Sequence, residues 1–177
     1  MSRYLALAAY VATIIAANWM TDTFGLVPIW FGLTVTAGTF AAGFALITRD
    51  WVQMTNRRII LLGAILVGAA LSALTSTPQL AVASGIAFLA SELVDTGVFT
   101  PMRSRSLPLA VIVSSLIAAP VDTILFLWIA GFPLTWEAIL GQVLVKTVLA
   151  LIVAALIKVR EDRRAIPQRS DQQEHAR

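Results

Sequence analysis

The sequence predicts an all-α integral membrane protein that crosses the bilayer six times, with both termini in the cytoplasm. The 177-residue chain is 58% hydrophobic and only 13% charged, whereas soluble domains contain about 25% charged residues. The apolar residues form six long runs, and apart from Lys146 the basic residues lie only in alternate connections between these runs. Composition and run length therefore predict the fold class, and the charge pattern predicts the topology.

Each apolar run is a candidate membrane-spanning helix, which needs about 20 mostly apolar residues to cross a hydrocarbon core of about 30 Å. Connections rich in Gly, Pro, Ser, Thr or charge separate the runs. The first run lacks a small-residue cleavage site, so we interpret it as a mature helix rather than a signal peptide. The six runs are Tyr4–Met20, Trp30–Ile47, Ile59–Leu74, Leu80–Phe99, Leu107–Ala130 and Trp136–Ile157.

The basic residues of the connections predict the orientation. Arg3 precedes the first run, three arginines lie between the second and third, and Arg103 and Arg105 lie between the fourth and fifth. Six basic residues follow the last run, and the other three connections contain none. Cytoplasmic connections are enriched in Lys and Arg, so we expect both termini there. Residues 1–160 would form the transmembrane domain, and residues 161–177 a disordered polar tail.

Several chemistries are disfavoured by composition. The chain has no cysteine, which excludes disulfides, thiolate zinc sites and thiol nucleophiles, and its single histidine, His175, lies in the polar tail. We therefore predict no enzyme activity, no cofactor and no metal site. The net charge of +3 and the pI near 10 are typical of cytoplasmic loops in a membrane protein, and we do not expect nucleic-acid binding.

Polar residues within the runs predict a buried site. With a helical rise of about 1.5 Å per residue, Asn18, Asp122 and Gln142 all lie about 21–23 Å from the cytoplasmic face. Asp122 follows Pro120, which lacks a backbone donor, so we expect the helix to bend around a polar site there. Asp122 also has no basic partner on its own run. The alternative for Asn18 and Gln142 is interhelical hydrogen bonding without a ligand.

A more central layer contains Lys146, about 16 Å deep, and Glu92, about 10 Å deep, while Asp95 lies about 6 Å deep. Gln142 and Lys146 are four residues apart and share a helix face. These residues could instead have purely structural roles: Glu92 would form an ion pair with Lys146, and Asp95 would cap its helix or pair with Arg103. Polar groups from four runs at overlapping depths predict a solvated pocket of the kind that transporters contain.

The tryptophans have two interpretations. Trp19, Trp30 and Trp136 lie near the expected outer interface, where an aromatic belt is common. Alternatively, Trp19 or Trp30 stacks on a flat ligand.

Four segments resemble the VUT, or queuosine precursor transporter, family. They are "ANWMTDTFG" at the end of the first run, "FGLTVTAGTFAAGFALITRDWVQ" through the second, "ASGIAFLASELVDTGVFTPMR" through the fourth and "SSLIAAPVDTILF" in the fifth. The resemblance implies a six-helix bundle similar to the substrate-binding components of vitamin ECF transporters, in a bacterial plasma (inner) membrane. It also implies uptake of a 7-deazaguanine, most often 7-cyano-7-deazaguanine.

The polar residues are chemically compatible with such a ligand. Asp122 or Glu92 can accept the adjacent ring N–H and amino donors, while Asn18, Gln142 and Lys146 can meet the acceptor edge. Asp95 and the "TPMR" segment are candidate cytoplasmic gate residues.

The mode of transport is left with two interpretations. The chain has no GxxxxGK[ST] motif, so it cannot use ATP in that way. It acts alone, as a facilitator or ion-coupled carrier, or it docks on an energising module through the small residues Ala8, Ala12 and Ala16; a homo-oligomer is a further alternative. Other function classes are an ECF component with a different ligand, a membrane enzyme acting on lipid-linked substrates, and a membrane subunit without a ligand.

Overall fold

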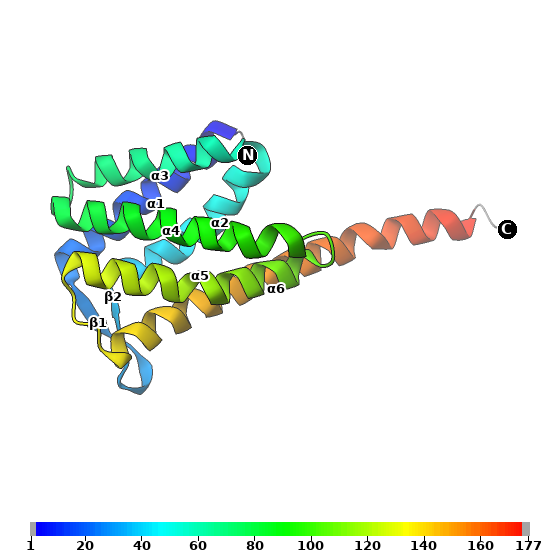
Figure 1. Cartoon of the computed structure of the whole chain (residues 1–177). Coiled ribbons are helices and arrows are strands. Elements are labelled where there is room, and N and C mark those ends of the chain that lie inside the picture. Colours follow the sequence, from blue (N-terminus) through cyan, green and yellow to red (C-terminus); the bar gives the residue numbers. More distant parts are fainter. Residues whose placement is uncertain (1–2, 175–177) are drawn as a thin grey trace.

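In the computed structural model, six α-helices surround the interior and a short β-hairpin lies between the first two (Figure 1). The structure describes residues 3–174, without the side chains of residues 46, 47, 50, 51, 53, 54 and 160–174. The expected all-α class is found, with the hairpin as an addition. The elements are α1 (Arg3–Phe24), β1 (Leu26–Pro28), the 3-10 helix η1 (Trp30–Gly32), β2 (Thr34–Thr36), α2 (Gly38–Thr55), α3 (Arg58–Ser72), α4 (Pro78–Met102), α5 (Leu107–Ala130) and α6 (Trp136–Glu174).

The hairpin corrects the prediction for the second run, which placed a helix over Trp30–Ile47. β1 and β2 pair antiparallel, with Val27 opposite Val35. β-Branched Val and Thr favour strands, and positive φ angles at Phe31 and Gly32 turn the chain between them. The first part of the predicted helix was therefore wrong. The helix α2 begins only at Gly38 and continues to Thr55.

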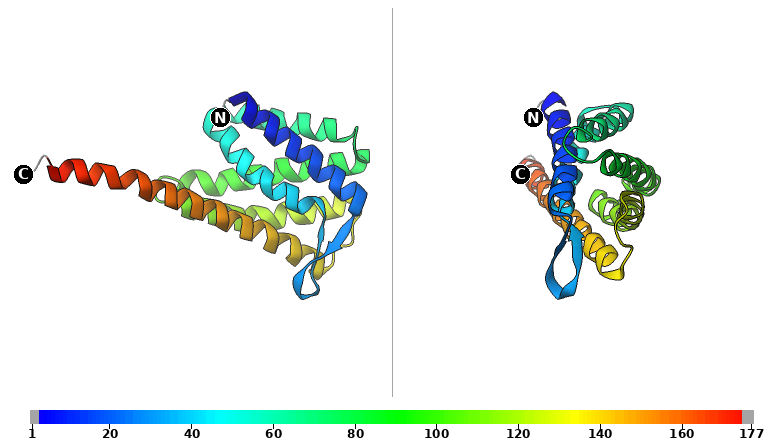
Figure 2. Two further views of the ribbon diagram at one scale, coloured as in Figure 1. Left: turned by 180° about the vertical axis from the view of Figure 1, so that it is seen from behind. Right: turned by 90° about the vertical axis from the view of Figure 1, so that its left-hand side faces the viewer.

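The six helices form a closed ring in the order α1, α2, α6, α5, α4, α3, with α3 packed back on α1. The end-on view in Figure 2 shows this arrangement around the interior. The ring closes where α2 meets α6, and there a Cβ on Gly43 would collide with the side chain of Leu149. A glycine at this position therefore lets the first and last parts of the chain approach closely.

An apolar cluster fills the space between α1, α2 and α3, and its members are Ala6, Tyr10, Ile14, Ala45, Val52, Leu61, Ala64 and Ile65. The fully buried side chains that carry charge lie elsewhere, on α4, α5 and α6, and Arg49 of α2, whose side chain is 14% exposed, contacts those on α4. The interior is therefore divided into a dry side and a polar side, and the polar side contains the candidate site.

Local signals fix the ends of the two helices that carry the carboxylates. The hydroxyl of Thr77 accepts a hydrogen bond from the backbone N–H of Leu80 (3.4 Å) at the start of α4, and Ser106 does the same for Leu109 (3.4 Å) at the start of α5. α5 ends at Gly131, whose φ of 78° is left-handed. Pro120 lies inside α5, which continues through it as one helix.

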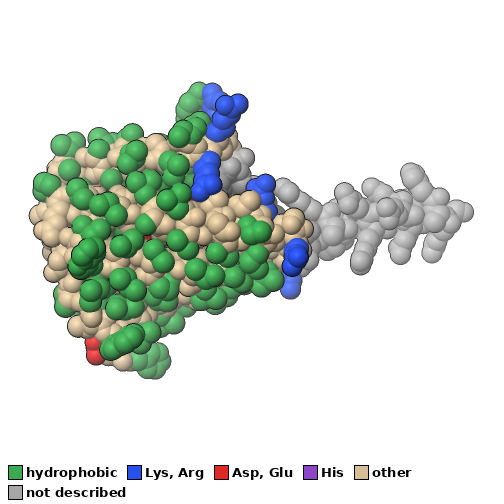
Figure 3. Space-filling view, viewed as in Figure 1, with side chains coloured by type: hydrophobic (Ala, Val, Ile, Leu, Met, Phe, Trp, Pro, Cys, Tyr) green, Lys and Arg blue, Asp and Glu red, His purple; other side chains and the backbone are tan. Residues whose placement is uncertain are grey.

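The two ends of the ring differ in charge. One end, hereafter the termini end, contains the start of α1, the α2–α3 and α4–α5 connections and the C-terminal half of α6 (Figure 1). The opposite end, hereafter the hairpin end, contains the β-hairpin and the α3–α4 and α5–α6 connections. Lys and Arg side chains gather toward the termini end, while apolar side chains cover the flank (Figure 3). This distribution agrees with the sequence-based assignment of the connections.

Four described helices are long and apolar enough to cross a membrane: Arg3–Phe24, Pro78–Met102, Leu107–Ala130 and the Trp136–Val159 part of α6. α3 is apolar but has only 15 residues. The helical backbone of α6 continues to Glu174 and so includes most of the segment expected to be a disordered tail. The side chains of that segment and residues 175–177 lie outside the described residues, and the tail stays a prediction.

Candidate functional site

A short ion pair joins α6 to α5 in the interior. The ammonium of Lys146 donates to Asp122 Oδ2 at 2.6 Å and to the hydroxyl of Thr123 at 2.9 Å. Both charged side chains are about nine-tenths buried. The alternative in which Glu92 pairs with Lys146 was wrong, because Lys146 pairs with Asp122. Asp122 has no basic partner on its own helix, and its partner is Lys146 of α6, four residues beyond Gln142.

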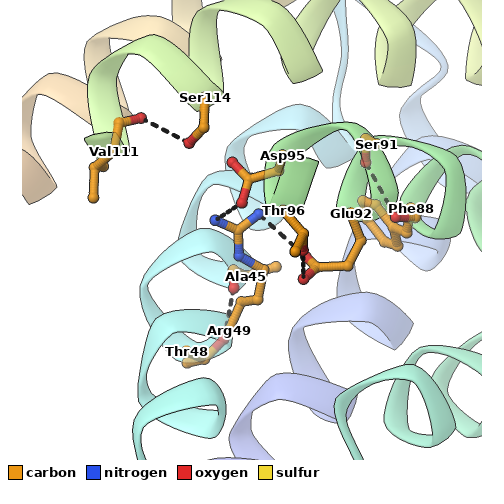
Figure 4. A network of polar contacts seen from close by, with 10 residues as sticks. All are labelled: Ala45, Thr48, Arg49, Phe88, Ser91, Glu92, Asp95, Thr96, Val111 and Ser114. Atoms are coloured by element: carbon orange, nitrogen blue, oxygen red, sulfur yellow. Dashed lines mark hydrogen bonds and ion pairs between the residues drawn. The ribbon is translucent and has the colours of Figure 1, made fainter. Parts of the chain in front are cut away.

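A second charged cluster joins α2 to α4 nearer the termini end. The guanidinium of Arg49 reaches two carboxylates through different nitrogens: Nη1 lies 3.4 Å from Glu92 Oε2, and Nη2 lies 3.5 Å from Asp95 Oδ2 (Figure 4). Glu92 and Asp95 are each only 2% exposed. The hydroxyl of Thr96 also donates to Glu92 Oε1 at 3.4 Å. The alternative that paired Asp95 with Arg103 was therefore wrong, since Asp95 pairs with Arg49.

Arg49 is the main residue that sequence reasoning missed. From the sequence we placed Arg49 in a cytoplasmic connection, which left Lys146 as the only basic residue within the runs. In the structure it lies within α2 and its side chain is 14% exposed. The signal was present, because "LITRDWVQ" contains no helix-breaking residue between Ile47 and Thr55.

Two cavities lie on either side of the Lys146–Asp122 pair. The first, the Arg49 cavity, has about 60 Å³ of space for water centres, which corresponds to roughly four to six waters. The second, the Asn18 cavity, lies toward the hairpin end and has about 30 Å³. Both cavities are lined by Ala42, Phe88, Asp122 and Lys146. The ion pair and Phe88 therefore form the partition between them.

The Asn18 cavity contains polar atoms without partners. The amide nitrogens of Asn18 and Gln142 are buried and donate to no atom of the described protein, and Asp122 Oδ1 accepts from none. Asn18 and Gln142 are each only 1% exposed. Buried polar groups normally find hydrogen-bond partners. Two amide donors and one carboxylate acceptor around one cavity are therefore available to water or to a polar ligand.

The structure brings six of the eight predicted site residues to the cavities. Asn18 and Gln142 line the Asn18 cavity, Glu92 and Asp95 line the Arg49 cavity, and Asp122 and Lys146 line both. The two tryptophans do not line either cavity: Trp19 is 49% exposed and packs edge-on against Phe24, and Trp30 is 83% exposed at the hairpin.

The aromatic rings that do line the cavities were not identified from the sequence. Tyr10 lies at the Arg49 cavity, Phe126 at the Asn18 cavity and Phe88 at both. Nothing in their sequence context separates them from the many other apolar residues of the same helices. Their position next to the unpartnered polar atoms is visible only in the fold.

The comparisons with known proteins identify a family for nearly the whole chain. Residues 4–159 match the model of the family described as "Putative vitamin uptake transporter". No curated protein and no solved structure matches the chain. The matched range begins within α1 and ends within α6, so it includes every residue that lines the two cavities.

Proposed function

We propose, from the premise that this chain belongs to the vitamin uptake transporter family, that it imports a queuosine precursor of the 7-deazaguanine class. Family membership shows that the chain is a membrane transporter. The 7-deazaguanine substrate is our proposal. We further propose that the protein lies in a bacterial inner membrane with the termini end in the cytoplasm, since that end carries the basic connections.

The observation that supports the substrate is the set of unpartnered polar atoms in the Asn18 cavity. A 7-deazaguanine presents a ring N–H and an amino group side by side, with a carbonyl oxygen next to them. Asp122 can accept both donors through its two oxygens, and the amides of Asn18 and Gln142 can donate to the carbonyl. The ring of Phe88 or Phe126 offers an apolar face for stacking. The donor and acceptor types thus match one edge of the base.

Substrate binding would add to the hydrogen bonds of the ion pair. In the structure Asp122 Oδ2 accepts from Lys146, and Oδ1 accepts no hydrogen bond from the described protein. Each carboxylate oxygen has two lone pairs, so Oδ1 and Oδ2 can both accept from the base while Oδ2 keeps Lys146. This arrangement keeps both buried charges hydrogen-bonded.

The test is thermal stabilisation of the detergent-purified protein by 7-cyano-7-deazaguanine, its aminomethyl relative, queuine, guanine and several vitamins. At 100 times its dissociation constant a ligand stabilises the folded state by about 2.7 kcal/mol. We expect a deazaguanine response that D122N abolishes. The matched control is E137Q, which removes a carboxylate outside both cavities. A deazaguanine analogue without the amino group should bind more weakly, because it gives Asp122 only one donor.

A second candidate is an ECF-type substrate-binding component with a different vitamin ligand. The feature that favours it is the surface of α1, where Ala8 and Ala12 are exposed and allow another helix to approach closely. A response to a vitamin but to no deazaguanine, together with co-purification of a membrane partner and ATPase subunits, would replace the first candidate by this one.

A further inference from the structure

The Arg49 cavity has no role in the function proposed above, although it is the larger of the two cavities. It has about 60 Å³ of space for water centres, whereas the Asn18 cavity has about 30 Å³. Side chains from α1, α2, α4, α5 and α6 line it, and they include apolar, aromatic and polar groups. A cavity with mostly apolar walls and a few polar groups is the usual form of a small-molecule site.

One oxygen of Asp95 is available to a ligand in the Arg49 cavity. Asp95 Oδ2 lies 3.5 Å from Arg49 Nη2, whereas Oδ1 accepts no hydrogen bond from the described protein. The residue is 2% exposed, and its second oxygen is turned away from Arg49 (Figure 4). Glu92 differs, because Arg49 and Thr96 contact its two oxygens. A buried acceptor such as Asp95 Oδ1 is costly unless water or a ligand donates to it.

Other groups in the same lining suit a flat molecule that carries N–H donors. Asp122 also lines the Arg49 cavity, and its Oδ1 accepts no hydrogen bond from the described protein. The hydroxyl of Ser91 donates to the backbone oxygen of Phe88 at 3.1 Å, so the hydroxyl oxygen can accept from a ligand. Phe88 and Tyr10 supply aromatic rings on which a base can stack. These acceptors and rings are the same types of group that the Asn18 cavity offers.

We propose that the Arg49 cavity is a second binding position for the imported base, which the base reaches after it passes Phe88 and the Lys146–Asp122 pair. Asp95 Oδ1 accepts from the ring N–H and amino edge of the base in this position. Asp95 lies seven residues before the end of α4 at Met102, about 10 Å along the helix, so the second position lies toward the termini end. The identity of the base rests on the proposed function, whereas the position itself rests on the lining of the cavity.

Single cysteines can report on each cavity separately, because the natural sequence has none. Ser115 lines only the Arg49 cavity, and Ser84 lines only the Asn18 cavity. The purified S115C and S84C proteins are treated with methyl methanethiosulfonate in detergent, with and without 7-cyano-7-deazaguanine, and mass spectrometry gives the rate of modification. At ten times the dissociation constant of a position, the ligand should slow modification of its cysteine about tenfold. S114C is the matched control, because Ser114 is 1% exposed but lines neither cavity; its rate should not change.

Further substitutions separate direct protection of S115C from an indirect effect of binding in the Asn18 cavity. N18L removes a donor from the Asn18 cavity alone, and D95L removes an acceptor from the Arg49 cavity alone. We expect N18L to abolish protection of S84C and preserve that of S115C, and D95L to do the reverse. A119L fills the Arg49 cavity without removing a charge and should act as D95L does. Loss of S115C protection in N18L, or its persistence in A119L, overturns the second position.

The two cysteines also separate this inference from the proposed function. Protection of S84C without protection of S115C supports the proposed substrate and refutes the second position. Protection of S115C alone refutes the placement of the base in the Asn18 cavity and supports the position in the Arg49 cavity. If neither cysteine is protected by 7-cyano-7-deazaguanine, its aminomethyl relative or queuine, both proposals are overturned.

Discussion

The ammonium of Lys146 lies 2.6 Å from Asp122 Oδ2, so a buried ion pair joins α6 to α5 at the partition between the two cavities. The pair has a structural role before any ligand binds. Removing one partner leaves the other charge buried without compensation, whereas removing both leaves none.

The pair should therefore show strong non-additivity in a double-mutant cycle. We expect D122A or K146A alone to destabilise the protein by about 3–5 kcal/mol, and D122A/K146A to cost much less than the sum of the two. Thermal or denaturant unfolding in one detergent measures the cycle. Additive effects would mean that the two side chains do not interact in the folded protein.

Phe88 should contribute to ligand binding, and Trp30 should not. Phe88 lines both cavities, while Trp30 is exposed at the hairpin. F88L should weaken binding by about 0.5–1.5 kcal/mol, the usual worth of an aromatic contact beyond its area. W30L serves as the control, with unchanged affinity expected by isothermal titration. Loss of affinity in W30L instead would show that the hairpin folds over the bound ligand.

Gly141 should tolerate no side chain, because a Cβ there would collide with the backbone oxygen of Thr34 in β2. G141A should separate the hairpin from α6 and destabilise the protein by about 1–3 kcal/mol. The control is G63A in α3, where a Cβ meets nothing within 4 Å and helix propensity predicts a gain of up to about 1 kcal/mol. Equal melting temperatures for the two variants would contradict the close contact between α6 and β2.

The orientation should be readable with single cysteines, because the natural sequence has none. S104C lies in the α4–α5 connection at the termini end, and T75C lies in the α3–α4 connection at the hairpin end; both positions are exposed. A membrane-impermeant maleimide added to intact cells should label T75C and leave S104C unlabelled until the membrane is opened. The reverse pattern would invert the proposed orientation.

Most of the helices could be predicted from the sequence because hydrophobic runs and helix-capping residues are local signals. Leu107–Ala130 was predicted with the bounds that α5 has, since Ser106 and Gly131 mark both ends. The hairpin was missed because the apolar residues Trp30, Phe31 and Val35 raise the hydropathy of a segment that does not form a helix. Run length alone cannot separate these cases.

The candidate site was predicted in its residue types but not in its pairing. Depth along each helix placed Asn18, Asp122 and Gln142 together, and all three line the Asn18 cavity. Which charges meet depends on the rotation and order of the helices in the ring, and no sequence periodicity fixes that order. For this reason the sequence suggested Glu92 as a partner of Lys146. Arg49 was not among the predicted site residues because it was placed in a connection, whereas it lies within α2.

The ring order also divides the molecule into two halves with different electrostatic contacts. The chain passes from one half, α1–α3, to the other, α4–α6, only at the α3–α4 connection. The halves pack together where α3 and α1 contact α4, and on the other side of the ring where α2 and β2 contact α6. Lys146 and Asp122 belong to the same half, so their contact survives if the halves move apart. The contacts of Arg49 with Glu92 and Asp95 join one half to the other and must break. Asn18 and Gln142 also lie on different halves, so a molecule that bridges them would hold the two halves together near the hairpin end, as Arg49 does nearer the termini end.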